Sequence, residues 1–378
     1  MTDYTKRDRL AGRSLALEAL AGRPTRQVPV GVITWGFEYY WQVAGLAPWQ
    51  LACGSSESWH KAHVTLYERH RPDLVWYSGG GSGPKEPTLL EDTELAWVVK
   101  DNNTGEEYEM IKGSLARRNR ESLSKNCDPV GAMESREDVN RLIPEFTGWG
   151  EIYLGGLRAL ISELGDRALV LPHHSPGYIC ACYAFGFGRA MELMLTDPDL
   201  FIYVCDRYAS GDRLRMQELA DAGAEAVYIA DGWASCDIIS PRMFDRFALP
   251  YQKSIAEAAH AAGLRVILWN EGNVLPILDR EAALDIDAFG TEQPRKGADT
   301  TVAAAREVFG PNRCLFGNLD SEHLLRRNDT KEIERAVCEQ IAMSGPGAPF
   351  ILSTGSPIPS RTEPEAVDTV IRAARSLP

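Results

Sequence analysis

Residues 226–269 read AVYIADGWASCDIISPRMFDRFALPYQKSIAEAAHAAGLRVILW, and this stretch decides the class of fold. It begins and ends with short apolar runs, Ala226–Ala230 and Arg265–Trp269, which have the length and composition of buried strands. Between them, Ser240–Ala262 is typical of a helix, with a proline near its start and a glycine just past its end. A strand, a helix and a second strand in this order predict parallel strands covered by helices.

The same alternation continues along the rest of the chain. Six further apolar runs predict strands, namely Val28–Trp35, Leu74–Ser78, Ala168–Pro172, Ala288–Thr291, Cys314–Phe316 and Phe350–Ser353. Strands in this number, separated by helices, are what a (β/α)₈ TIM barrel requires. The glycines at 79–81 lack G-x-G-x-x-G spacing, which favours a tight turn over a nucleotide-binding loop. The sequence therefore predicts an α/β fold, a single barrel domain over 1–378 with an N-terminal helix within 4–22.

The stretch 86–148 interrupts this rhythm after the second strand. Leu95–Lys100 and Tyr108–Ile111, joined by a glycine-containing turn, predict a β-hairpin. A basic segment follows, with Arg117, Arg118, Arg120 and Lys125, and then a helix that begins near Ser135. We expect this insertion to form a lid over the carboxyl-end face of the barrel, with the basic side chains on a solvated face or against an anionic substrate.

Composition and charge exclude several classes of protein. The net charge of −13 and the pI near 5.1 argue against a nucleic-acid partner and against an anionic membrane surface. No run approaches the roughly 18 apolar residues that would span a bilayer. The first twenty residues are charged and lack an apolar signal region, and the 8 cysteines are scattered, so we expect a cytoplasmic protein whose cysteines mostly lie in the core.

The carboxyl ends of the predicted strands indicate where chemistry should lie, because barrel enzymes carry their reactive groups there. Three polar residues near these ends are candidate catalytic groups: Asp231, Glu271 and Asn273. Aromatic, amide and other polar residues around them are candidate substrate contacts: Trp35, Phe37, Tyr40, Tyr77, His174, Trp233, Asn270, Glu292, Asn318 and Ser356. This composition suits a flat, largely apolar organic ligand that is oriented by a few polar groups.

Each of these groups has a structural alternative. The aromatic cluster at 35–41 is either a wall of the substrate site or a hydrophobic plug over the barrel mouth. His173 and His174 are more often partners of helix ends or core carbonyls than metal ligands. Asp231 and Glu292 could form a structural pair, whereas an unpaired carboxylate at Glu271 would be costly unless it had a function.

Several segments resemble the uroporphyrinogen decarboxylase superfamily, which also contains zinc methyltransferases that act on corrinoid proteins. The resemblance rests on YIADGWASCDIISPRMFDRFALPYQKSIAEAAHAAGLRVILWNEGNVLPIL at 228–278, FGNLD at 316–320 and ILSTGSPIPSRTEPE at 351–365. These matches occur in order from about residue 180 to the end of the chain. The resemblance implies a (β/α)₈ barrel, in agreement with the strand pattern.

The signature positions of both activities differ in this chain. The decarboxylase carries Met-Arg-Gln-Ala-Gly-Arg after its first strand, where this chain has VGVITWGFEYYWQVAG, so the cations that hold a polyanionic tetrapyrrole are missing. The zinc ligands of the thiol methyltransferases correspond by resemblance to Trp269, Glu271 and Ser356, of which only Glu271 remains a good ligand. We therefore expect neither uroporphyrinogen decarboxylation nor a thiol substrate.

The resemblance favours methyl transfer between a cobalamin carried by a separate corrinoid protein and a small molecule, either a donor such as a methoxylated aromatic or a pterin acceptor. Glu271 or Asp231 would assist proton movement. A relocated metal, zinc for example, would use Glu271 with Cys236 or His174. Two alternatives stay open: a lyase that decarboxylates another organic acid, and a non-catalytic binding barrel. Family members often form homodimers, so a homodimer is expected here by resemblance.

Overall fold

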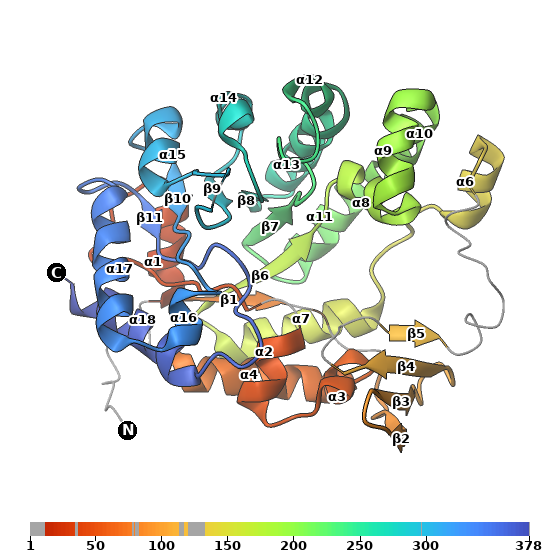
Figure 1. The fold of residues 1–378 in the computed structure, drawn as a ribbon, viewed down its shortest axis with the longest axis horizontal. Helices are drawn as coiled ribbons and strands as arrows, with labels where there is room; N and C mark the ends of the chain where they lie inside the picture. Colours follow the sequence, from red (N-terminus) through yellow and green to blue (C-terminus); the bar gives the residue numbers. More distant parts are fainter. Residues whose placement is uncertain are drawn as a thin grey trace.

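The computed structural model describes residues 12–34, 37–77, 79, 83–112, 117–119, 133–295 and 297–377, and gives only the backbone of Phe37, Glu38, Ala52 and Arg117–Asn119. Its centre is a curled parallel sheet of 7 strands in the order β1-β6-β7-β8-β9-β10-β11 (Figure 1). The strands are β1 Leu74–Tyr77, β6 Leu169–His174, β7 Ala226–Ala230, β8 Arg265–Asn270, β9 Ala288–Thr291, β10 Cys314–Phe316 and β11 Phe350–Ile351. The α/β class and all the predicted strands from Leu74 onward are confirmed, with ends that differ by one or two residues.

The predicted first strand, Val28–Trp35, is wrong as a regular strand. Its described part, up to Thr34, is extended but makes a single isolated bridge, from Val30 to Leu352. Pro29 has no N–H to donate, and the N–H of Val30 is taken by the Asp73 carboxylate at 2.8 Å, so a regular ladder does not form. The segment still contacts both edges of the sheet: Gly31 N donates to Leu352 O at 2.9 Å, and Asp73 N donates to Val30 O at 2.8 Å.

Helices surround the strands, and the one that precedes β8 has an irregular start. The predicted helix Ser240–Ala262 consists of α12 Pro241–Met243, a π-helical turn at Phe244–Ala248, and α13 Leu249–Ala261. Ser240 caps it by accepting a hydrogen bond from Met243 N at 3.3 Å. Pro250 cannot donate to the preceding turn, which explains why the ladder widens just before it.

The other helices lie around the sheet (Figure 1). They are α2 Phe37–Ala44, α3 Pro48–Ala52, α4 Ser56–His70, α6 Arg136–Leu142, α7 Glu151–Leu164, α8 Gly177–Phe185, α9 Phe187–Thr196, α10 Pro198–Ala209, α11 Asp212–Asp221, α14 Leu278–Ala282, α15 Val302–Phe309, α16 Leu324–Arg327, α17 Thr330–Met343 and α18 Pro364–Ser376. Among the helices, α13, α14, α15 and α17 flank the outer side of the sheet, whereas α6 lies apart from it beside α10 (Figure 1). None of the helices within the described ranges is both long enough and apolar enough to cross a bilayer.

The interior of the curled sheet is filled by aromatic rings. Trp76, Tyr228, Trp269 and Phe316 contact one another there, with ring centroids 4.5 to 6.4 Å apart. Gly290 makes room for one of them, because a Cβ at that position would lie 2.2 Å from the Trp269 ring. The N-terminal helix α1, Gly12–Leu20, joins this interior cluster through its apolar face, and its existence confirms the prediction for that segment.

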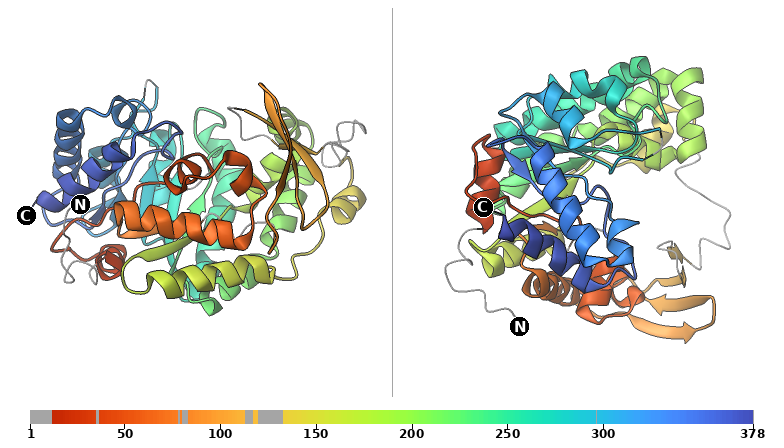
Figure 2. Two further views of the ribbon diagram at one scale, coloured as in Figure 1. Left: turned by 90° about the horizontal axis from the view of Figure 1, so that it is seen from below. Right: turned by 60° about the vertical axis from the view of Figure 1, so that its left-hand side comes forward.

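The insertion forms its own antiparallel sheet, beside the parallel one (Figure 2). The predicted hairpin is confirmed as β3 Ala96–Lys100 and β4 Glu107–Ile111. Two strands that the sequence did not predict, β2 Thr88–Asp92 and β5 Arg117–Asn119, extend it on either side. The helix expected near Ser135 is α6, capped by that serine. Arg120 and Lys125 lie outside the described residues, so the lid remains a prediction.

The expectation of a core role is confirmed for four of the cysteines within the described ranges. Cys53, Cys182, Cys205 and Cys314 are buried, whereas Cys180 and Cys236 are half-buried and Cys338 is exposed. Burial raises the pKa of the Cys182 thiol, which keeps it protonated and unreactive.

Candidate active site

Two carboxyl groups lie fully buried below the carboxyl ends of β7 and β8. Asp231 follows β7, and its Oδ2 accepts a hydrogen bond from Gln252 Nε2 of α13 at 2.9 Å. Glu281 lies on α14, and its Oε1 accepts from Asn270 Nδ2 at 2.8 Å. We call Asp231 and Glu281 the buried acid pair. Sequence reasoning missed Glu281, because it lies on a helix and not after a strand.

Desolvation favours the protonated form of both members of the buried acid pair. Burial raises the pKa of Asp231 to about 7, and burial together with the charge of Asp231 raises the pKa of Glu281 to about 8. Within the described chain, the second oxygen of each group has no hydrogen-bond partner. The oxygens of Gln252 and Asn270 are likewise unpartnered there, so the four groups form a buried polar cluster with unused hydrogen-bonding capacity.

Three further carboxyl groups lie nearer the surface at the same ends of the strands. Glu292 accepts from Gly272 N at 3.0 Å, and Asp237 accepts from Asn273 N at 2.6 Å. Arg295 bonds both, at 3.1 Å to each carboxylate. Glu271 completes this set, which we call the open acid group: Asp237, Glu271 and Glu292. The Arg295 cation is therefore already committed to two of its members.

Glu271 is the member of the open acid group without a partner. Among the residues that the structure describes, none donates a hydrogen bond to its half-buried carboxylate or forms an ion pair with it. Burial and then the charge of Glu292 raise its pKa. A Cβ on residue 232 would lie 2.9 Å from Glu271 Oε2. The glycine at position 232 therefore leaves room for the Glu271 carboxylate.

An exposed group of aromatic rings lies beside Glu271. Tyr183 of α8 and Phe187 of α9 each pack edge-on against Trp233, at centroid distances of 5.1 and 5.3 Å. Burial and then the charge of Glu271 raise the pKa of Tyr183 to about 12. We call Tyr183, Phe187 and Trp233 the aromatic trio. Only Trp233 was predicted, since the other two lie on helices.

The predicted aromatic wall at 35–41 is structural where it is described. Trp35 lies outside the described residues, as does the side chain of Phe37. Tyr40 is fully buried and donates its hydroxyl hydrogen to Trp76 O at 2.7 Å. Tyr77 is also buried and donates to Tyr153 O at 2.7 Å. Tyr40 and Tyr77 are thus core residues, and the prediction that they contact substrate is corrected.

Several polar candidates also have structural partners. His174 Nε2 lies 3.1 Å from Asp212 Oδ1, and Arg215 contacts the same oxygen. Asn318 donates to two backbone carbonyls and accepts a hydrogen bond from Gln340. Both ends of the Asn318 amide are therefore in use. Ser356 donates to Gln293 Oε1 at 2.9 Å. These three organise loops at the carboxyl ends of the strands.

Asn273 contributes its backbone to the turn at the mouth. Its N–H bonds Asp237, and its carbonyl accepts from Cys236 N at 2.9 Å. The histidine next to His174 is kept neutral, because burial lowers the pKa of His173 to about 4. The backbone of Asn273 and the neutral imidazole of His173 therefore supply no charged group to a substrate.

The predicted relocated metal site is not assembled. No group of three or more His, Cys, Asp or Glu side chains in the described ranges is arranged to hold a metal ion. Glu271, Cys236 and His174 have different neighbours: Cys236 lies near Glu281 and Asp237, and His174 bonds Asp212. Their placement after adjacent strands did not determine the directions of the side chains.

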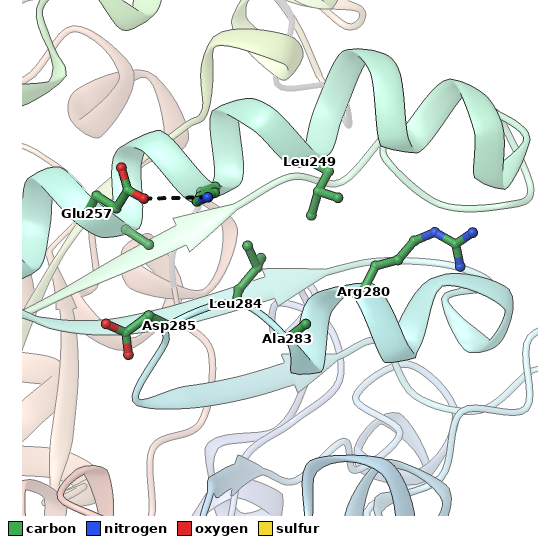
Figure 3. Close-up of a pocket in the computed structure, with 8 residues that line it drawn as sticks. Leu249, Glu257, Arg280, Ala283, Leu284 and Asp285 are labelled. Atoms are coloured by element: carbon green, nitrogen blue, oxygen red, sulfur yellow. Dashed lines mark ion pairs between the residues drawn. The ribbon is translucent and has the colours of Figure 1, made fainter.

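A groove of about 300 Å³ lies elsewhere, between α13 and α14 on the outside of the sheet (Figure 3). Figure 3 shows Leu249 and Glu257 on one side of it, and Arg280 and Leu284 on the other. No predicted site residue lines it. The groove is separate from the carboxyl-end face that carries the polar groups described above.

Comparison with known proteins gives a consistent picture. The family model described as Uroporphyrinogen decarboxylase (URO-D) matches residues 129–377. The uroporphyrinogen decarboxylase of Dichelobacter nodosus is 32% identical to this chain over 52% of its length. That of Syntrophotalea carbinolica is 27% identical over 58% of this chain. The matched region spans 50% of the length of the first relative and 64% of the length of the second.

Similarity to solved structures extends over the whole chain. A methyltransferase from Methanosarcina mazei superposes with a TM-score of 0.71 at 20% identity, covering 97% of this chain and 98% of that protein. A B12-independent methionine synthase from Shewanella superposes less closely, with a TM-score of 0.51 at 8% identity, over 93% of this chain and 98% of that one. At these identities the likeness concerns the fold.

Proposed function

The chain belongs to the uroporphyrinogen decarboxylase family, whose members are enzymes, and from this premise we propose that it transfers a methyl group between a small organic substrate and a separate corrinoid protein. The observation that carries the proposal is the charge of the carboxyl-end face. Two of the three carboxyl groups of its open acid group, Glu292 and Asp237, are bonded to Arg295, and no cation of the described residues pairs with the third, Glu271. Such a face repels a polyanionic tetrapyrrole and suits a neutral or cationic substrate.

We also infer that the sheet closes into a barrel through the extended segment 29–34. Its backbone hydrogen bonds, to Leu352 just after β11 and to Asp73 just before β1, support this closure. Ile33 adds two further contacts on the β11 side, donating to Thr354 Oγ1 at 3.0 Å and accepting from Ile358 N at 2.9 Å. A closed ring gathers all carboxyl ends at one mouth, which the proposed site requires.

In this proposal Glu271 is the carboxylate that contacts the substrate. It has no hydrogen-bond or ion-pair partner among the described residues, it lies next to exposed rings, and Gly232 leaves room for its side chain. Asp231 is fully buried and bonded to Gln252, which makes it a positioning residue rather than a substrate contact. Burial favours the uncharged forms of Asp231 and Glu281, so the more exposed negative charge comes from the open acid group.

Zinc does not fit the positions that the resemblance assigns to it. Trp269 is packed in the interior of the sheet against Tyr228 and Phe316, and the hydroxyl of Ser356 is used by Gln293. Glu271 is the remaining good ligand. We therefore propose no step through a metal at these positions, and the corrinoid of the partner protein is treated as the second substrate.

The partners and compartment remain proposals of the same kind. The name of the Methanosarcina mazei protein supports methyl transfer, because that fold covers nearly the whole of both chains. The names of the curated relatives support the alternative lyase. A homodimer and a cytoplasmic location follow from the resemblance and from the composition, and size measurement in solution tests the first of them.

One assay separates the candidate functions. The purified protein is incubated with cob(I)alamin and a panel of methylated donors, including methoxylated aromatics and alkylated amines, while the absorbance of methylcobalamin is followed. We expect methylcobalamin to appear with at least one donor and to disappear in the Glu271→Ala variant. Release of carbon dioxide from an organic acid, with no methyl transfer, would establish the lyase. Retained biological activity in Glu271→Ala and Asp231→Ala would establish the binding barrel.

A further inference from the structure

The aromatic trio is exposed to a degree that packing alone does not explain. Tyr183 is 61% exposed and Phe187 is 50% exposed, although both contact Trp233. The three rings come from α8, α9 and the loop after β7, so they converge from separate elements. A cluster of exposed rings at the mouth of a parallel sheet is typical of a ligand surface.

Glu271, for which the described residues supply no hydrogen-bond or ion-pair partner, lies beside this surface. Trp233 directly follows Gly232, where a Cβ would lie 2.9 Å from Glu271 Oε2. The carboxylate therefore adjoins the loop that carries one of the three rings. Glu292 is paired with Arg295, whereas no described cation pairs with Glu271.

The chemistry of this combination selects a class of ligand. The faces of aromatic rings attract cations, and a carboxylate in partly buried surroundings stabilises a positive charge further. An anionic ligand would be repelled by Glu271 and Glu292. A neutral ligand would leave the Glu271 carboxylate unpaired and partly desolvated, which costs free energy. A bulky organic cation with an apolar surface satisfies both the rings and the charge.

We propose that the aromatic trio and Glu271 bind an alkylated ammonium group, and that this group is the methyl donor. The second part rests on the proposed methyl transfer. In that step the bond between the methyl carbon and nitrogen breaks and nitrogen keeps its electron pair, so the cation becomes a neutral amine. The reduced corrinoid of the partner protein supplies the electron pair for the new bond to carbon. The leaving amine takes up no proton, so the step needs no acid in contact with the substrate.

Binding is tested first, without turnover. Choline and its uncharged carbon isostere 3,3-dimethylbutan-1-ol are titrated against the full chain by calorimetry and by tryptophan fluorescence. The two probes have the same shape, so their difference reports the charge. We expect choline to bind about 10-fold more tightly or better, as a cation–π and carboxylate contribution of about 1.4 kcal/mol implies. Equal affinities, or no binding of choline, would overturn the proposal.

Variants locate the site. Glu271→Gln and Trp233→Leu should each weaken choline binding about 10-fold and leave the isostere nearly unchanged, whereas Trp233→Tyr should retain most of the affinity. Leu195→Ala is the control, because Leu195 is 76% exposed and lies near the end of α9. Circular dichroism confirms folding of each variant. Unchanged binding in folded Trp233→Leu would place the cation elsewhere.

The outcomes distinguish this inference from the proposed function. Selective choline binding without methyl transfer from any donor would support the site and overturn the methyltransferase. Methyl transfer from a methoxylated aromatic, with no preference for the charged probe, would support the methyltransferase and overturn the site. The aromatic trio could instead bind the corrinoid protein. In that case Trp233→Leu would lose its association with the corrinoid protein, and choline would not affect that association. This result would also overturn the proposal.

Discussion

The buried acid pair and the open acid group come from the same stretch of the sequence, residues 231–292, and behave differently. Asp231 and Glu271 each follow a neighbouring strand of the same sheet. Asp231 is fully buried and its pKa is raised to about 7, whereas Glu271 is half-buried beside exposed rings and keeps an open face. The type of residue and its position after a strand are the same. Desolvation raises the pKa of both carboxyl groups, and the complete burial of Asp231 is what keeps it away from a ligand.

The largest expected effect is the pH dependence of stability from the buried acid pair. Asp231 and Glu281 have folded-state pKa values of about 7 and about 8, above the values near 4 of the unfolded chain. The folded chain therefore holds more protons between these limits. The free energy of unfolding should fall as pH rises from about 4 to about 8, by up to about 1.4 kcal/mol per pH unit for each group, and then level off.

Denaturant unfolding at a series of pH values measures this slope. The double variant Asp231→Asn, Glu281→Gln should lose most of it, and each single variant should lose part. Glu339→Gln, on the exposed side of α17, is the control and should keep the slope. If the double variant has the same slope as the parent chain, the pair is not responsible and the contrast between the two acid groups fails.

The next effect comes from removing the donor that serves the buried pair. Gln252→Leu deletes the hydrogen bond to Asp231 and leaves a fully buried carboxyl unsatisfied. We expect a loss of about 2 kcal/mol in the free energy of unfolding at pH 6, because the desolvation cost of the carboxyl is no longer offset. Thermal and denaturant unfolding check this value, and a change below about 0.5 kcal/mol would contradict the assignment.

Removing the donor that serves the open acid group should lower the free energy of unfolding by less. Arg295→Gln removes the cation shared by Glu292 and Asp237, whose side chains are partly exposed to water. We expect a loss of about 0.5 to 1 kcal/mol, reduced further by added salt. The variant also leaves more uncompensated negative charge near Glu271, so choline should bind at least as tightly as before. Weaker choline binding would indicate that Arg295 shapes the site.

The smallest stability effect is expected from crowding Glu271. In Gly232→Ala, the added methyl group would lie 2.9 Å from Oε2, at the free end of a flexible side chain that can move away. Stability should change by less than about 1 kcal/mol, while choline affinity falls several-fold because the carboxylate is displaced. Gly188→Ala, which has open space around it on α9, is the control and should keep the affinity.

The candidate site was predictable where residues follow strands and unpredictable where they lie on helices. Asp231, Glu271, Glu292 and Trp233 were all found from the rule that barrel chemistry gathers at carboxyl ends. Glu281, Tyr183 and Phe187 reach the same region from α14, α8 and α9, and no periodic signal marks them. Tyr40 and Tyr77 satisfied the rule as well, but their hydroxyls bond backbone carbonyls in the core.

The amino-acid sequence by itself determined the parallel α/β order of the chain, since short apolar runs alternate with helices and turn residues mark the boundaries. It also determined the family, through segments that keep their order from about residue 180 onward. Only the tertiary structure decided which side chains are neighbours. Glu281 lies near Asp231, whereas Cys236 and His174 have other neighbours than Glu271. Exposed rings lie beside the Glu271 carboxylate, which has no partner among the described residues. The physical reason is that strand pairing follows local pattern, whereas burial and charge depend on neighbours brought together from distant parts of the chain.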